Sequence, residues 1–121
     1  FMSCSVFGIL HIANPEVAQL GYGFIFVYFI GSFILGITVL MDDGLELVLG
    51  FHAANNIFIA LLLTSDWTVL QTESVLKDIS DPTFGIYDIL TGSILYPSVI
   101  YIFAKKYSWT NWKEKIFSRV R

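Results

Sequence analysis

The chain has 121 residues, of which 55% are hydrophobic, 17% aromatic and 14% charged, and its mean hydropathy is +0.69. This composition excludes an ordinary soluble domain and predicts a membrane protein. The formal net charge is -3, yet six of the seven basic residues lie in the last seventeen positions. A basic cluster at the end of an apolar chain favours a cytoplasmic juxtamembrane segment over a nucleic-acid-binding tail, and we expect no nucleic-acid partner.

The N-terminal residues 1–13 are apolar but too short to cross a bilayer, as expected for the second half of a helix. Because the chain starts with Phe1 inside this apolar stretch, we expect it to be the C-terminal part of a longer protein. Pro15 then disfavours helical geometry at Asn14, which places His11 near the end of the half helix. The single cysteine, Cys4, is expected to be a small buried packing residue.

Residues 22–41 are predicted to form the first complete membrane span. The segment has twenty uncharged positions, which cover about 30 Å as a helix and match the hydrocarbon thickness of a bilayer. Gly31, Ser32 and Gly36 would allow a neighbouring helix to approach closely.

Residues 45–63 are predicted to form the second span, despite a polar centre. Asp43 and Glu46 have the spacing of a capping box, which would start this helix. The segment contains His52 and Asn56, one turn apart on one face, whereas Asn55 points about 100° away and could bond a neighbouring helix.

Residues 64–85 are expected to form a polar, mostly acidic loop in water, followed by a third span over 86–104. Asp88 lies near the start of that span, and Pro97 marks a kink. Residues 105–121 are predicted to form a basic amphipathic tail. In a helix its apolar side chains share one stripe that would lie on the inner leaflet, namely Trp109, Trp112, Ile116 and Val120. The fold class is therefore an all-α, multi-spanning transmembrane helix bundle that is incomplete at its N-terminus.

The two histidines, His11 and His52, both fall in membrane segments. Polar side chains at membrane depth are costly and usually face a bundle interior or a wet cavity, so they are candidates for function. Two plainer interpretations remain open. His52 and Asn56 can form hydrogen bonds that hold helices together. His11 can be a histidine at a helix end that lies at the membrane interface.

Phe7-Gly8-Ile9-Leu10-His11 resembles the F-x-x-x-H motif, and His52-Ala53-Ala54-Asn55-Asn56 the H-x-x-x-N motif, of the CPBP intramembrane proteases. That family includes CAAX-processing endopeptidases and bacteriocin-immunity proteins. The resemblance covers residues 1–63 and implies a hydrolase of membrane-associated peptides or proteins, such as prenylated tails or leader peptides. It implies a multi-pass protein of a bilayer, the bacterial inner membrane. Lys105 and Lys106 after the third span place the C-terminus in the cytoplasm by the positive-inside rule.

The same resemblance implies catalytic roles for His11, His52 and Asn56, with Phe7 as the supporting motif residue. His11 would help a glutamate to activate water, while His52 and Asn56 would donate hydrogen bonds to the oxyanion. The glutamate belongs to a first motif, E-E-x-x-x-R, that this chain lacks, so we expect the chain to be inactive alone. Glu46, the carboxylate nearest to His52 in sequence, or Asp88 could replace that glutamate in principle, although both are expected at helix starts.

Three further alternatives stay open from the sequence. His11 and His52 could instead ligate zinc, although the H-E-x-x-H motif of zinc proteases is absent. A non-catalytic immunity or scaffold protein would use the same fold, and a histidine proton relay in a transporter would need acidic partners within the spans. If the two histidines share a cavity, residues 12–21 must be kinked or partly unwound near Asn14-Pro15-Glu16 and line that cavity.

Overall fold

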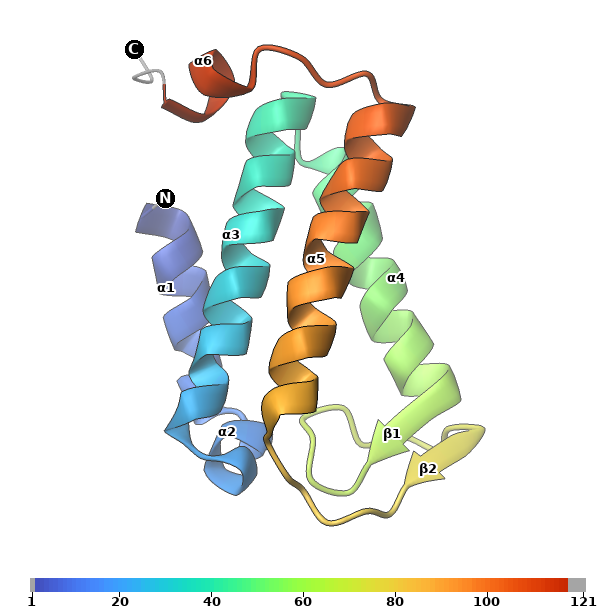
Figure 1. Ribbon diagram of the computed structural model, residues 1–121. Helices are drawn as coiled ribbons and strands as arrows, with labels where there is room; N and C mark the ends of the chain where they lie inside the picture. Colours follow the sequence, from blue (N-terminus) through green and yellow to red (C-terminus); the bar gives the residue numbers. More distant parts are fainter. Residues whose placement is uncertain (1, 118–121) are drawn as a thin grey trace.

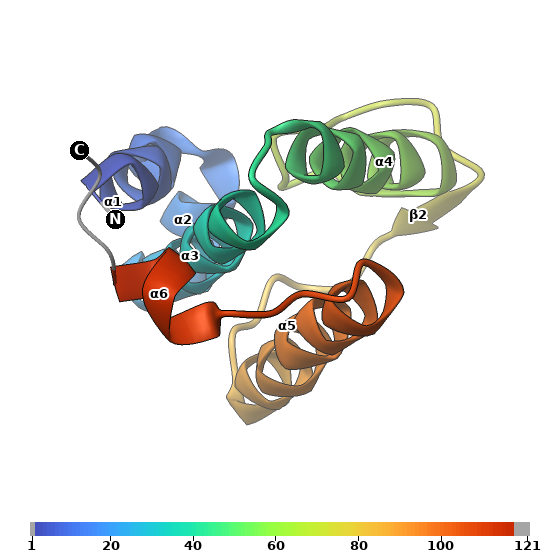
Figure 2. The same cartoon turned by 90° about the horizontal axis from the view of Figure 1, so that it is seen from above.

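The computed structural model describes residues 2–117 and is mostly helical. Three long helices form its body: α3 (Ile25–Asp42), α4 (Glu46–Leu62) and α5 (Ile86–Lys106) (Figure 1). Helix α3 contacts both α4 and α5, and α1 (Met2–Leu10) packs along α3. Seen along the helices, α4 and α5 lie on the same side of α3, opposite α1 (Figure 2). The shorter elements are the 3-10 turns His11–Ala13 and Tyr22–Phe24, α2 (Pro15–Leu20) and α6 (Trp112–Phe117).

The all-α expectation is wrong in one place, because two short strands follow α4. Strand β1 (Leu63–Ser65) pairs in parallel with β2 (Leu76–Asp78). Thr64 is 3% exposed, and its hydroxyl lies 2.8 Å from the Ser74 hydroxyl. A polar segment that is buried at a helix end needs partners for its backbone, and a strand pair supplies them. The expected loop over 64–85 is therefore partly ordered by β pairing.

Two helices of the described part are long and apolar enough to cross a membrane: Tyr22–Asp42 and Ile86–Lys106, each of 21 residues. They contain the first and third predicted spans. The second predicted span, 45–63, is a helix of 17 residues, which covers about 26 Å and is shorter than predicted. Helix α4 is thus an apolar helix that is shorter than the two candidate spans.

The small residues of α3 lie where other elements come close, as predicted. A side chain at Gly36 would collide with the Cys4 sulfur on α1, and one at Gly31 would come within 3.2 Å of the Tyr96 hydroxyl on α5. Ser32 is 4% exposed and donates its hydroxyl to the carbonyl of Tyr28. Small side chains therefore let α1 and α5 pack against α3.

The predicted capping box at Asp43 and Glu46 is wrong. Asp43 adopts the left-handed conformation with φ of 55° and ends α3, a conformation that aspartate tolerates better than most residues. Helix α4 begins after Leu45 with no side-chain cap, and the Asp43 carboxylate forms an ion pair with Lys115. The residue that was expected to start α4 therefore closes α3 and holds the tail.

The expected position of Asp88 at the start of α5 is confirmed. The Gly85 backbone N–H donates to the Asp88 carboxylate at 2.8 Å, so Asp88 stabilises the start of the helix. Helix α5 continues without a break through Pro97. The Ser98 hydroxyl, one residue later, donates to the Ile94 carbonyl at 2.7 Å.

Part of the tail packs on the protein, and the predicted stripe does not lie on one helix, because Trp109 precedes α6 and is buried. Trp109 is 9% exposed and donates its indole N–H to Asp42 at 3.3 Å. Lys115 donates to the Met41 carbonyl at 2.9 Å, so α6 lies across the end of α3 (Figure 2). The reason is that the end of α3 offers an acidic, carbonyl-rich surface to an indole and an ammonium group. Arg119 and Val120, also part of the predicted tail helix, lie outside the described residues.

Candidate functional site

A cavity of about 560 Å³ lies between the helices near the strand end of the molecule. Its walls come from α1, the segment after it, α3, α4, α5 and the loop after β1. His11, His52 and Asn56 all line it, and so does Phe7. The four residues that the sequence singled out are therefore brought to one place from separate helices.

Phe7 joins the two histidines. Its ring makes edge contacts with the rings of His11, at a centroid distance of 4.9 Å, and of His52, at 6.0 Å. The Phe7 carbonyl also lies 2.8 Å from Nδ1 of His11. A carbonyl accepts hydrogen bonds only, so Nδ1 carries the ring proton and Nε2 of neutral His11 is free to accept one.

His52 and Asn56 form a pair along α4. The Asn56 amide nitrogen lies 3.3 Å from Nε2 of His52, and both side chains are half-buried. An amide nitrogen has two hydrogens, so Asn56 can donate one to His52 and keep the other for a ligand. Asn55 was expected to bond a neighbouring helix, but it is exposed and lies 3.5 Å from the Asn56 carboxamide oxygen.

Glu16 is the site residue that the sequence analysis missed. It is 7% exposed, it lines the cavity, and it accepts the Tyr28 hydroxyl at 2.6 Å and the Val69 backbone N–H at 3.1 Å. Tyr28 in turn stacks on His11, with ring centroids 4.4 Å apart and an interplanar angle of 25°. A signal was present, because Glu16 is the one charged residue of the segment 12–21 that was expected to line the cavity.

The segment that carries Glu16 has the predicted kink. A 3-10 turn over His11–Ala13 ends α1, Asn14 is extended, and α2 begins at Pro15. The missing N–H of Pro15 and its fixed φ suit the first position of a helix, so the break falls between His11 and Glu16. The kink therefore brings an imidazole and a carboxylate to the same cavity.

The loop after β1 also reaches the site, which its polar composition did not predict. Thr68, Val69 and Leu70 line the cavity, and the Thr68 hydroxyl donates to the Ser65 carbonyl at 3.2 Å. Farther along, Lys77 and Asp66 form an exposed ion pair at 2.6 Å. The hydrogen bond to Asp66 raises the pKa of Lys77.

The two carboxylates considered as replacements for the missing glutamate are not at the site. Glu46 is exposed at the start of α4, and Asp88 caps α5. Neither lines the cavity. Their place near helix N-termini agrees with a role in helix stability rather than in the site.

His11 and His52 supply only part of the ligands that a zinc site needs. The described residues 2–117 contain no group of three His, Cys, Asp or Glu placed to hold a metal ion. His11 and His52 supply two imidazoles, with the Phe7 ring in contact with both, whereas zinc sites in proteins use three or four protein ligands. The two imidazoles would need one or two further ligands to hold a zinc ion.

Comparison with known proteins identifies no family, but it finds a relative. No protein-family model and no solved structure matches the chain. The chain is similar to the uncharacterized protein YyaK of Bacillus subtilis (strain 168), at 32% identity over 68 residues. The match covers 49% of this chain and 20% of that protein, so the chain spans about a fifth of the relative's length.

Proposed function

We propose that the chain is part of an intramembrane endopeptidase of the CAAX-protease type, which hydrolyses membrane-associated peptides or proteins. The observation that carries the proposal is that His11, at the end of α1, and His52 and Asn56, on α4, line one cavity. This agrees with the resemblance to the F-x-x-x-H and H-x-x-x-N motifs. Histidine and asparagine are groups that hydrolases use for proton transfer and oxyanion stabilisation.

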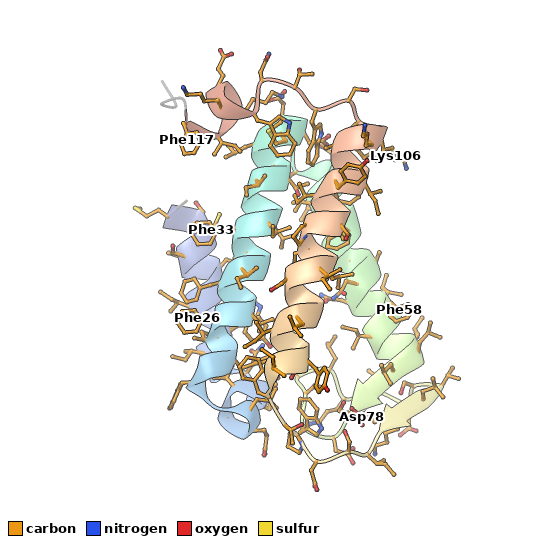
Figure 3. All side chains as sticks on the ribbon, viewed as in Figure 1. Phe26, Phe33, Phe58, Asp78, Lys106 and Phe117 are labelled. Carbon is orange, nitrogen blue, oxygen red and sulfur yellow. The ribbon has the colours of Figure 1, made fainter. Side chains whose placement is uncertain are left out.

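A bilayer setting for this enzyme is supported by the outer faces of the helices. Phe26 on α3 is 68% exposed and Phe58 on α4 is 58% exposed, and both point away from the bundle (Figure 3). None of the described residues of α5 is buried, although that helix is apolar enough to cross a membrane. We propose a multi-spanning bundle in a bacterial inner membrane, with Lys105 and Lys106 on the cytoplasmic side.

The proposed reaction is attack of water on the carbonyl carbon of a peptide bond. The water loses a proton to a glutamate that lies outside this chain, with Nε2 of His11 as a second acceptor. Asn56 and His52 donate hydrogen bonds to the oxyanion, each worth about 3 to 4 kcal/mol in the transition state. For His52 this requires a hydrogen on Nε2, so the bond from Asn56 to that nitrogen breaks when the oxyanion forms. The C–N bond then breaks, and the proton passes to the leaving amine. On this proposal the chain is inactive by itself, because it lacks the glutamate motif.

A non-catalytic immunity or scaffold protein is the second candidate, and Glu16 favours it. The carboxylate at the cavity already accepts hydrogen bonds through both of its oxygens, so it is not free to act as a base. A cavity whose carboxylate is held by hydrogen bonds in this way can bind a peptide without cleaving it. This alternative holds if the complete gene product also lacks the glutamate motif.

Cleavage of membrane peptides by the complete gene product in proteoliposomes tests the proposal. His52→Ala and Asn56→Ala should each lower kcat roughly 100- to 1,000-fold, as loss of an oxyanion donor does in other hydrolases. Ile57→Ala is the matched control, because Ile57 follows Asn56 and is 57% exposed on the outer face of α4. Undiminished cleavage by the His52→Ala variant rejects the catalytic assignment.

A further inference from the structure

We propose that Glu16 is a positioning residue of this site: one carboxylate oxygen holds Tyr28 against His11, and the other holds the segment 68–70 at the cavity. The inference rests on the proposed function, because it assigns Glu16 a role in the proposed catalytic site. It assigns a task to a residue that neither motif includes. The supporting contacts come from three separate parts of the chain.

The first contact fixes the ring of His11. The Tyr28 hydroxyl donates to Oε1 of Glu16 at 2.6 Å, which is short, as expected for a hydrogen bond to a carboxylate. The Tyr28 ring stacks on His11 at 4.4 Å. The Phe7 carbonyl holds Nδ1 of the same imidazole from α1. Because Glu16 sets where the Tyr28 ring lies, it sets the orientation of His11 through that ring.

The second contact fixes the loop. Oε2 of Glu16 accepts the backbone N–H of Val69 at 3.1 Å, across 53 positions of sequence. The Thr68 side chain is bonded to the carbonyl of Ser65 at the end of β1. The segment 68–70 is therefore held from both sides where it lines the cavity.

The burial of Glu16 explains why these contacts matter. The side chain is 7% exposed, and the ion pairs found in the described part of the chain, Lys77 with Asp66 and Lys115 with Asp43, do not include it. A buried carboxylate without a cation depends on its hydrogen-bond donors. Asn14 adds a third donor, 3.5 Å from Oε1. Loss of the carboxylate would therefore release all three donors: Asn14, Tyr28 and the Val69 N–H.

A positioning residue needs its hydrogen bonds, whereas a reacting base needs its charge, so a neutral side chain of the same shape separates the two roles. Glutamine has the shape of glutamate and no charge. Its amide oxygen can accept from Val69 while its amide nitrogen donates to the Tyr28 oxygen, since a phenol both donates and accepts. Glu16→Gln should therefore preserve the role, whereas Glu16→Ala removes it.

The tautomer of His11 can be measured by ¹⁵N NMR of the chain in lipid nanodiscs, and this test of the role of Glu16 does not depend on enzymatic activity. The chain has two histidines, so ¹⁵N-histidine labelling gives two ring systems, which His52→Ala assigns. We expect one neutral tautomer for His11, with Nδ1 protonated, in the wild type and in Glu16→Gln. Glu16→Ala and Tyr28→Phe should show a mixture of tautomers. An unchanged His11 tautomer in both of these variants overturns the inference.

Kinetics of the complete gene product provide the second measurement. Glu16→Ala should lower kcat roughly 10- to 100-fold, as misplacement of a reacting group does, and Glu16→Gln should stay within about fivefold of wild type. Glu46→Ala is the control, because Glu46 is exposed and does not line the cavity. If Glu16→Gln loses as much activity as Glu16→Ala, the charge itself is required and the positioning role is wrong. If no peptide is cleaved, the proposed function fails while the NMR result still decides the role of Glu16.

Discussion

The amide nitrogen of Asn56 lies 3.3 Å from Nε2 of His52, one turn earlier on the same helix. The two polar groups thus partner each other within α4 rather than binding two helices together. A pair one turn apart on a helix contributes only about 0.2 to 0.5 kcal/mol. We predict that Asn56→Ala lowers the free energy of unfolding in detergent by less than about 1 kcal/mol. A loss of several kcal/mol would instead support the plainer interpretation, in which these residues hold helices together.

Close packing of α1 on α3 should depend on Gly36. A side chain there would collide with the Cys4 sulfur, whereas nothing lies within 4 Å of the position that a side chain at Gly50 would occupy. Gly36→Leu is therefore expected to destabilise the fold by about 1 to 3 kcal/mol, and Gly50→Leu to leave it close to wild type. Chemical unfolding of the two variants in the same detergent measures this difference. Equal stability of both would contradict the packing described.

Release of the tail from the end of α3 is expected when Lys115 is replaced. Its ammonium group bonds the Met41 carbonyl and the Asp43 carboxylate, but Asp43 is largely exposed, so the contribution is about 0.5 to 1 kcal/mol. Lys115→Met should make proteolysis of residues 107–117 roughly two- to fivefold faster. Lys113→Met serves as the control, because Lys113 is exposed on the same helix. Equal rates for the two variants would show that Lys115 does not hold the tail.

Order in the loop should depend on Thr64. The hydroxyl is buried and bonds both the Ser74 hydroxyl and the Thr72 carbonyl, at 2.8 and 3.2 Å. Thr64→Val removes two hydrogen bonds, at an expected cost of about 1 to 3 kcal/mol. Hydrogen exchange of the backbone over 63–78 should accelerate in that variant. Asp66→Asn removes an exposed ion pair and should change exchange little, since such pairs contribute about 0 to 1 kcal/mol.

The helices were predictable from the sequence because uncharged runs and their breaks are local signals. Residues 22–41 fall within the 3-10 turn Tyr22–Phe24 and α3, residues 86–104 fall within α5, and Pro15 marks the break after His11. The two strands were not predictable in the same way. Leu63–Ser65 and Leu76–Asp78 have no strand pattern of their own, and they pair because tertiary packing brings them together.

The part of the candidate site that depends on spacing along one helix was predictable from the sequence. His52 and Asn56 share a helix face by periodicity, and the structure brings Phe7 and His11 to them. The partners of Glu16 were not predictable, because Tyr28 and Val69 are 12 and 53 positions away, although its own segment, 12–21, was expected to line the cavity. Glu46 is the carboxylate nearest to His52 in sequence, but the carboxylate that lines the cavity is Glu16, which lies close to His11 in sequence.

The distance between positions 11 and 52 in a bilayer tests the central claim most directly. In a Cys4→Ser background, the pair His11→Cys and His52→Cys should be cross-linked rapidly by a short bifunctional maleimide, because both positions line one cavity. The pair His11→Cys and Phe58→Cys is the control, since Phe58 lies on the outer face of α4 (Figure 3). Fast cross-linking of the first pair alone is the expected result. Cross-linking of the control pair at an equal or higher rate would show that the two histidines do not meet, and would contradict the proposed site.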